Sequence, residues 1–236
     1  MEIEVRADGE PIGGQRALGE VESLRERARR VLRLAVAEGR LSAVHIYSVP
    51  TVAAKLWLSA TPVREAMLEL VGDQLMEAVP NRGFRLVIPP PEEMAKVGRI
   101  RLMLEPPTIG GLCHQLTPLQ IEGLRGMVDR VRKATLNSDV RAAIETDNRF
   151  HDVLVGLSDN DRLIELIARL RAQVRVGEVA LAPSPTSRDA LDRIQRLAPD
   201  GRQLLDELEA HRESEVQMSV RRYIKRSVPH PYDGTL

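Results

Sequence analysis

Two ionisable residues, Asp147 and His151, lie four positions apart in the second half of the chain. Residues with this spacing share one face of a helix, and the same stripe carries the apolar residues Ile144 and Leu154. A carboxylate and an imidazole are therefore predicted to point toward the interior of a helical bundle. Because buried polar groups need partners, the spacing indicates a polar pocket inside that bundle.

A cationic residue, Arg101, shares a helical stripe with Val97 and Leu104. A buried guanidinium requires an anion, which either a protein carboxylate or a bound ligand can supply. Two interpretations stay open at this point. Arg101, Asp147 and His151 either satisfy one another or surround a small anionic ligand.

Another group of polar residues lies in the first half of the chain. Ser59, Thr61 and Arg64 fall on the face of a predicted helix opposite its apolar positions, and such a face can enter the major groove of DNA. Arg82 stands beside Gly83 in a predicted hairpin turn, where a cation can contact a phosphate or the minor groove. Each feature alone is equally typical of a helix cap or a plain turn.

The charge of the chain is balanced overall but uneven locally. A formal net charge of zero argues against a globally basic nucleic-acid binder. Residues 22–40, however, carry six arginines against three glutamates, and Arg29 lies in the middle of this segment. The excess suits phosphate contacts, with a solvated helix face as the alternative.

The predicted elements that carry Ser59, Thr61, Arg64 and Arg82 follow a recognisable order. Apolar periodicity predicts helices over residues 23–39, after Pro50, and from Thr61, with Thr61 as the cap and Pro62 in the first helical position. Two short strands follow, at 75–79 and 84–88, joined by a tight turn. Three helices and a hairpin predict a winged helix-turn-helix over residues 21–88.

The remainder of the chain is predicted to be all-α. Three consecutive prolines, 89–91, indicate an extended linker at 89–95, followed by an antiparallel helical bundle over 96–227. The expected helices cover 92–105, 117–134, 139–157, 160–179, 187–197 and 200–225, the first broken by Pro106 and Pro107. Residues 1–20 and 228–236 are expected to be flexible tails. The fold class is thus mainly α with a small β-hairpin.

Bulk features narrow the function classes. With 43% hydrophobic residues, no apolar run of membrane-spanning length and no signal-peptide pattern, the expected location is the cytoplasm, without a membrane partner. The single cysteine, Cys113, is interpreted as a packed core residue. An enzyme is the disfavoured alternative, because no activated nucleophile, phosphate-binding glycine loop or second carboxylate pair accompanies Asp147 and His151.

The first half resembles the DNA-binding signature of the GntR family. The resemblance is carried by residues 53–56, 58–66 and 80–84, which read AAKL, LSATPVREA and PNRGF. It implies operator binding through this segment. Two residues depart from the family pattern, because Ala60 replaces its usual arginine and Trp57 its usual turn glycine. An arginine–guanine contact contributes about 1–3 kcal/mol of discrimination, so the Ala60 departure should weaken or retune operator choice.

The second half resembles the FadR-like subfamily with its FCD effector domain, through residues 147–151 and 158–160 together with Arg101 and Glu105. That resemblance implies a helical bundle that binds small organic acids, often with a divalent metal held by one Asp and three His. Asp147 and His151 match two of these ligands, whereas Gly201 and Tyr223 stand where the other two histidines belong. We therefore expect no tightly bound metal, and at most weakly held zinc or nickel.

The combined prediction is a homodimeric DNA-binding repressor that responds to a small carboxylic acid. The acid is expected to bind through Arg101, His151 and Tyr223, with Asp147 nearby and with a void at Gly201. The alternative is a dimer that binds DNA but has lost effector sensing. Both versions need two copies, because one recognition helix contacts too few base pairs to be selective.

Overall fold

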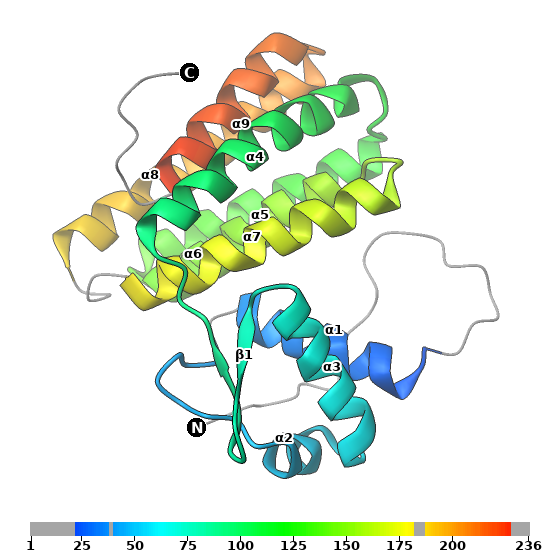
Figure 1. The fold of residues 1–236 in the computed structure, drawn as a ribbon. Helices are drawn as coiled ribbons and strands as arrows, with labels where there is room; N and C mark the ends of the chain where they lie inside the picture. The colour runs from blue at the N-terminus through cyan, green and yellow to red at the C-terminus, as the bar shows by residue number, and fades with distance from the viewer. Residues whose placement is uncertain (1–21, 38–39, 182–186, 228–236) are drawn as a thin grey trace. The chain divides into compact units, whose positions relative to one another are not determined.

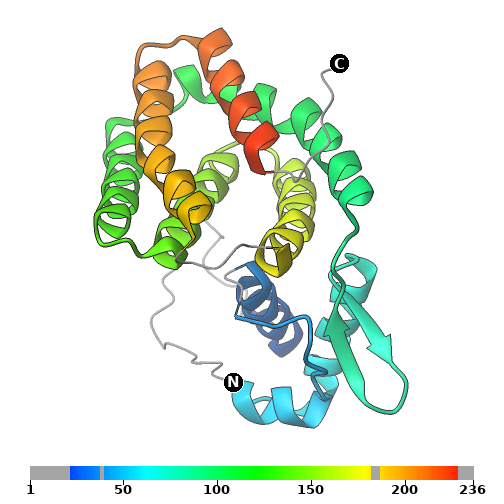
Figure 2. The ribbon, with the colours of Figure 1, turned by 90° about the vertical axis from the view of Figure 1, so that its left-hand side faces the viewer.

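The computed structural model describes residues 22–37, 40–181 and 187–227. The predicted tails, 1–20 and 228–236, lie outside the described residues. The chain forms two compact units (Figures 1 and 2). The first contains the described residues up to Met94 together with 169–180, and the second contains the rest.

The first unit has the predicted winged helix-turn-helix order. Its elements are α1 (Leu24–Ala37), α2 (Val49–Leu56), α3 (Ala60–Gly72), β1 (Met76–Val79) and β2 (Gly83–Leu86). Both α1 and α2 pack against α3, and the two strands pair antiparallel. The apolar core is centred on Val63, Ala66, Met67 and Leu70 of α3, all with 0% exposure. This burial confirms the apolar face predicted for the third helix.

The start of α3 differs from the prediction by two residues. Ser59 is the N-cap, with extended backbone, and Ala60 is the first helical residue. The expected cap at Thr61 and first position at Pro62 were therefore wrong. Pro62 occupies the third helical position instead, where its missing N–H still has no partner within the helix.

The hairpin is fixed by a close approach at Gly83. This residue has φ 131, and an added Cβ would lie 2.3 Å from the Tyr47 carbonyl oxygen. Tyr47 and Phe84 form an isolated antiparallel bridge, with backbone N–O distances of 2.7 and 3.0 Å. Only a glycine combines this dihedral angle with this contact.

The second unit is all-helical, as predicted. Its helices are α4 (Pro91–Gly110, within this unit from Ala95), α5 (Pro118–Leu136), α6 (Val140–Gly156), the first part of α7 (Asp161–Leu181), α8 (Arg188–Glu209) and α9 (Glu213–Ser227), with a 3-10 turn at Gly111–His114. Helix α5 packs against α6 and α8, and α8 also packs against α6 and α9. Helix α5 starts at Pro118, and its cap, Thr117, forms a full capping box with Gln120.

Two predictions based on proline were wrong. Pro91 is the first residue of α4, so helix replaces most of the predicted linker. Helix α4 also continues through Pro106 and Pro107 to Gly110. The Leu102 carbonyl, which loses its helical donor at Pro106, accepts a hydrogen bond from Arg221 Nη1 at 3.3 Å.

The predicted break between helices 187–197 and 200–225 was also wrong, because Pro199 lies inside a continuous α8. The chain turns later, at His211, which adopts φ 54. Backbone bonds from Arg212 to Glu207 (3.0 Å) and from His211 to Leu208 (3.1 Å) close the helix end in a Schellman motif. The predicted helix over 200–225 is therefore the end of α8 followed by α9.

Candidate functional site

The first candidate surface is the beginning of α3. Ser59, Ala60, Thr61 and Arg64 are all exposed there, while the opposite face of the helix is buried. The arrangement matches the form of a recognition helix, with polar and small side chains available to a groove. Base contact by these residues stays a prediction.

The other residues predicted for DNA contact have different surroundings. Arg82 is exposed in the hairpin turn, whereas Gly83 is half-buried against Tyr47. Arg29 lies in an ion pair that links α1 to α3, with its Nε 3.5 Å from Glu69 Oε2. A structural role therefore accompanies any phosphate contact that Arg29 makes.

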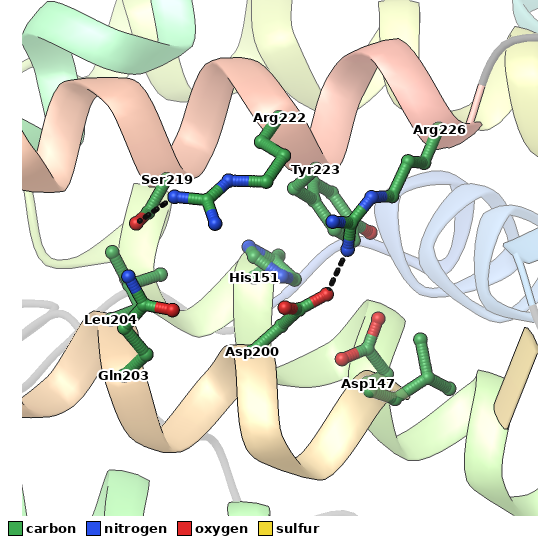
Figure 3. Close-up of a pocket in the computed structure, with 10 residues that line it drawn as sticks. Asp147, His151, Asp200, Gln203, Leu204, Ser219, Arg222, Tyr223 and Arg226 are labelled. Atoms are coloured by element: carbon green, nitrogen blue, oxygen red, sulfur yellow. Dashed lines mark hydrogen bonds and ion pairs between the residues drawn. The ribbon is translucent and has the colours of Figure 1, made fainter. Parts of the chain in front are cut away.

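The second candidate site is a pocket among α6, α8 and α9, with about 380 Å³ of empty space that includes open solvent. Figure 3 shows the side chains converging on it. Three of the five predicted effector residues line it, namely Asp147, His151 and Tyr223. The other lining residues are Leu197, Asp200, Gln203, Leu204, Ser219, Arg222 and Arg226.

An aromatic stack forms one part of the pocket. The rings of His151 and Tyr223 are nearly parallel, with centroids 3.6 Å apart and an interplanar angle of 20°. The Tyr223 hydroxyl donates to Asn148 Oδ1 at 3.3 Å, and the Phe150 ring meets His151 edge-on at 5.1 Å. Because Asp147 and His151 are 6% and 4% exposed, the predicted inward stripe of α6 is confirmed.

Two cations of the pocket were missed by the sequence reasoning. Arg222 donates to Ser219 Oγ at 3.4 Å, and Arg226 forms an ion pair with Asp200 of α8 (Figure 3). Both arginines lie on α9, on either side of Tyr223. The signal was available, because residues 219, 222, 223 and 226 share one helical stripe.

Arg101 is not among the residues that line this pocket. It is 2% exposed, and its Nε and Nη2 lie 2.5 and 3.3 Å from the two carboxylate oxygens of Glu105. Its Nη1 donates to Ser227 Oγ at 3.4 Å. The anion that this guanidinium requires is therefore supplied by the protein, four residues along the same helix.

The void predicted at Gly201 was wrong. A Cβ at this position would meet Val128 Cγ2 at 3.1 Å and Phe150 Cε1 at 3.8 Å. The glycine therefore lies against α5 and allows α8 to approach it closely, in agreement with the packing of these two helices.

The donor set does not fit a tightly held metal. Asp147 and His151 both line the pocket, and the Tyr223 ring covers the face of the imidazole. Among the described residues, no group of three or more His, Cys, Asp and Glu side chains is placed to hold a metal ion. Zinc sites normally need three or four protein donors, and Asp147 and His151 supply two.

Another pair of histidines, His114 and His211, lies away from the pocket in the second unit. His114 and His211 stack with centroids 4.8 Å apart, and His211 Nδ1 hydrogen-bonds the Cys113 carbonyl. Burial raises the pKa of the Cys113 thiol, and the charge of Glu213 raises it further. The 3% exposure of Cys113 agrees with its interpretation as a packed core residue.

A winged helix-turn-helix followed by a helical bundle defines a class of two-part transcription regulators. The FCD domain matches residues 96–226, and the chain belongs to that family, within the FadR-like GntR regulators. In the part of the chain that the structure describes, no helix is long and apolar enough to cross a membrane.

Two curated relatives are regulators. The chain is 28% identical over 125 residues to the "HTH-type transcriptional regulator McbR" of Escherichia coli (53% of this chain and 56% of that protein). It is 27% identical over 125 residues to the "Nta operon transcriptional regulator" of Aminobacter aminovorans (52% and 58%). The matches thus span just over half of each relative. At the level of the family, the prediction of a regulator rather than an enzyme is confirmed.

Solved structures agree on the fold. E. coli McbR/YncC superposes with a TM-score of 0.76 at 21% identity, covering 87% of this chain and 95% of that one. A GntR-type putative regulator from Rhodococcus sp. RHA1 gives 0.68 at 20% identity, with 86% and 94% covered.

Proposed function

We propose that this protein is a homodimeric cytoplasmic repressor whose affinity for operator DNA changes when a small carboxylic acid binds in the pocket of the helical unit. The observation that carries the proposal is that two arginines line the pocket together with a stack of the buried His151 and the half-buried Tyr223. Arg222 and Arg226 provide planar guanidinium groups, which bind carboxylates through two parallel hydrogen bonds.

The ion pair between Arg226 and Asp200 suggests how the ligand acts. A ligand carboxylate at Arg226 competes with Asp200 for the same guanidinium. Binding would then loosen a link between α8 and α9, so the ligand favours one arrangement of these helices over another. Only such a difference in affinity between two states can change DNA binding.

DNA recognition is assigned to the exposed start of α3, with Ser59, Ala60, Thr61 and Arg64, and to Arg82 of the hairpin. Arg29 and Gly83 support these elements. Two copies on a near-palindromic site are proposed, because two α3 helices read enough base pairs for selectivity. Sedimentation of the free protein and of its DNA complex measures the number of copies.

The central experiment is selection of duplexes from a random pool by the full chain, with and without a panel of small carboxylic acids. We expect a two-fold symmetric sequence whose affinity shifts at least several-fold with one of the acids. Arg222→Gln should abolish the shift while leaving DNA binding in place. Arg202→Gln, an exposed arginine of α8 outside the pocket lining, is the matched control and should retain it. A reporter gene then distinguishes repression from activation.

A second candidate is a dimer that binds DNA without responding to an effector. It is favoured by the pairing of Arg226 with Asp200 and of Arg222 with Ser219, since the pocket satisfies part of its own polar groups. Selected DNA whose affinity no acid alters, in wild type and Arg222→Gln alike, would establish this version.

The metal content is a separate proposal. We propose that the protein keeps no stoichiometric metal and that zinc or nickel binds only weakly. Elemental analysis after washing with a chelator measures this directly. Retention of one metal ion per chain would contradict the proposal.

A further inference from the structure

Trp57 is an unusual residue in the turn between α2 and α3. It is the only tryptophan of the chain, and its 91% exposure is the highest among the large apolar side chains of the described residues. Its backbone is left-handed, with φ 55 and ψ 41. Backbone bonds from Leu58 to Ala53 (3.1 Å) and from Trp57 to Ala54 (3.4 Å) place it in the position of a Schellman motif that glycine usually fills.

Folding does not explain a tryptophan at this position. A left-handed backbone is unfavourable for a bulky L-residue and free of that strain for glycine. The indole recovers little of this cost, because it stays in water instead of packing in the core. The side chain is therefore better explained by an intermolecular contact.

The sequence on both sides of Trp57 favours a polyanion as the partner. Residues 40–64 contain no Asp or Glu, and they include the cations Arg40, Lys55 and Arg64. Trp57 lies two residues before Ser59, the N-cap of the helix assigned to DNA recognition. An aromatic side chain without acidic neighbours in sequence, next to that helix, suits the sugars and base edges of a duplex.

We propose that Trp57 is a direct DNA contact, an apolar one made against deoxyribose and base edges beside the groove that α3 enters. This inference rests on the proposed function. A contact by Trp57 would also compensate for Ala60, whose methyl group cannot make the bidentate contact of an arginine. The chain thus replaces part of a charged readout by an apolar one.

The apolar character of the contact makes a distinct prediction about salt. Trp57→Gly should weaken binding to duplex DNA roughly tenfold, by a similar factor at every salt concentration, because no counterion is released by an indole. Arg64→Gln should instead reduce the slope of affinity against salt. Leu24→Ala, another exposed apolar residue of the first unit, should leave affinity unchanged.

The thermal stability of Trp57→Gly serves as a control, because it should change in the opposite direction to the DNA affinity. Because glycine relieves the left-handed strain, Trp57→Gly should melt no lower than wild type. Weaker DNA binding by a variant of equal or higher melting temperature cannot be attributed to unfolding. Unchanged DNA affinity in Trp57→Gly would overturn the proposal.

The single tryptophan also reports the contact directly. Full-length protein is titrated with fluorescein-labelled mixed-sequence duplex DNA at low salt, following DNA anisotropy and acrylamide quenching of Trp57 in parallel. A rise in anisotropy with several-fold weaker quenching supports the contact. A rise in anisotropy with unchanged quenching overturns it and leaves the proposed function intact.

Two further outcomes are decisive. No rise in anisotropy at any salt concentration overturns the proposed function and this inference together. Weaker quenching at high protein concentration without DNA identifies a second copy of the chain as the occupant, which also overturns the DNA contact.

Discussion

The buried pair of Arg101 and Glu105 gives the most quantitative prediction for the helical unit. The side chains are 3% and 0% exposed, and two hydrogen bonds of 2.5 and 3.3 Å join them. Arg101→Met removes the guanidinium and leaves the Glu105 charge buried without it. We expect the free energy of unfolding to fall by about 3–5 kcal/mol, the usual effect of breaking such a pair on one side.

Removing both charges should have a much smaller effect. In Arg101→Met with Glu105→Leu, neither charge of this pair remains to be desolvated, and apolar pairs of similar volume are often neutral or stabilising relative to a buried ion pair. Ser227, which also accepts a bond from Arg101, keeps its bond to the Ile224 carbonyl at 3.0 Å. The double variant should therefore recover most of the loss.

Urea unfolding followed by circular dichroism compares wild type, both single variants and the double variant. If Arg101→Met alone is as stable as the double variant, the charge of Glu105 does not depend on Arg101 and the reasoning fails. The same proteins test the ligand site by calorimetry. Acid binding that survives in the double variant but not in Arg222→Gln would assign ligand recognition to α9.

Three smaller predictions concern single positions. Gly83→Ala should lower the free energy of unfolding by at least about 2 kcal/mol through its φ of 131 and the contact with Tyr47, whereas Gly72→Ala, with open space around it, should be neutral or slightly stabilising in thermal melts. Burial raises the pKa of Tyr47 above 10.0, so the neutral phenol, bonded to Ser42, stabilises the fold below pH 10 and this contribution is lost as pH rises through the raised pKa. The stability difference between wild type and Tyr47→Phe should narrow there, and a constant difference would contradict the assignment. Cys113 should resist alkylation at neutral pH until the chain is unfolded, as measured by mass spectrometry.

Most of the fold could be predicted because its signals are local. The apolar period of α3 and the cap at Thr117 each depend on a few neighbouring residues, and both are found in the structure. One error occurs where a distant group compensates a local penalty. Pro106 ends a helix in isolation, but Arg221, more than a hundred positions away, donates to the carbonyl that the proline leaves without a partner.

The pocket shows the same division between local and distant information. The helical periodicity correctly predicted that Asp147 and His151 are buried, since this depends on α6 alone. The periodicity also correctly predicted that Arg101 is buried, but it did not identify the buried group that pairs with the guanidinium. The observed partner is the carboxylate of Glu105, one turn away on the same helix, and not Asp147 or a ligand.

Gly201 shows why a role in the site cannot be assigned to a residue only because it stands at the position of a metal-binding histidine in the family. A residue on α8 can face α5, α6 or α9, and a shift of one residue along the helix changes which of them it faces. Gly201 faces α5, while its neighbour Asp200 and the later Gln203 reach the pocket.

A pocket lined by Asp200, Arg222 and Arg226 holds both signs of charge, so an incoming acid must displace a carboxylate already present. Selectivity for its ligand should therefore depend on how well that ligand outcompetes Asp200, and Asp200→Asn should tighten acid binding.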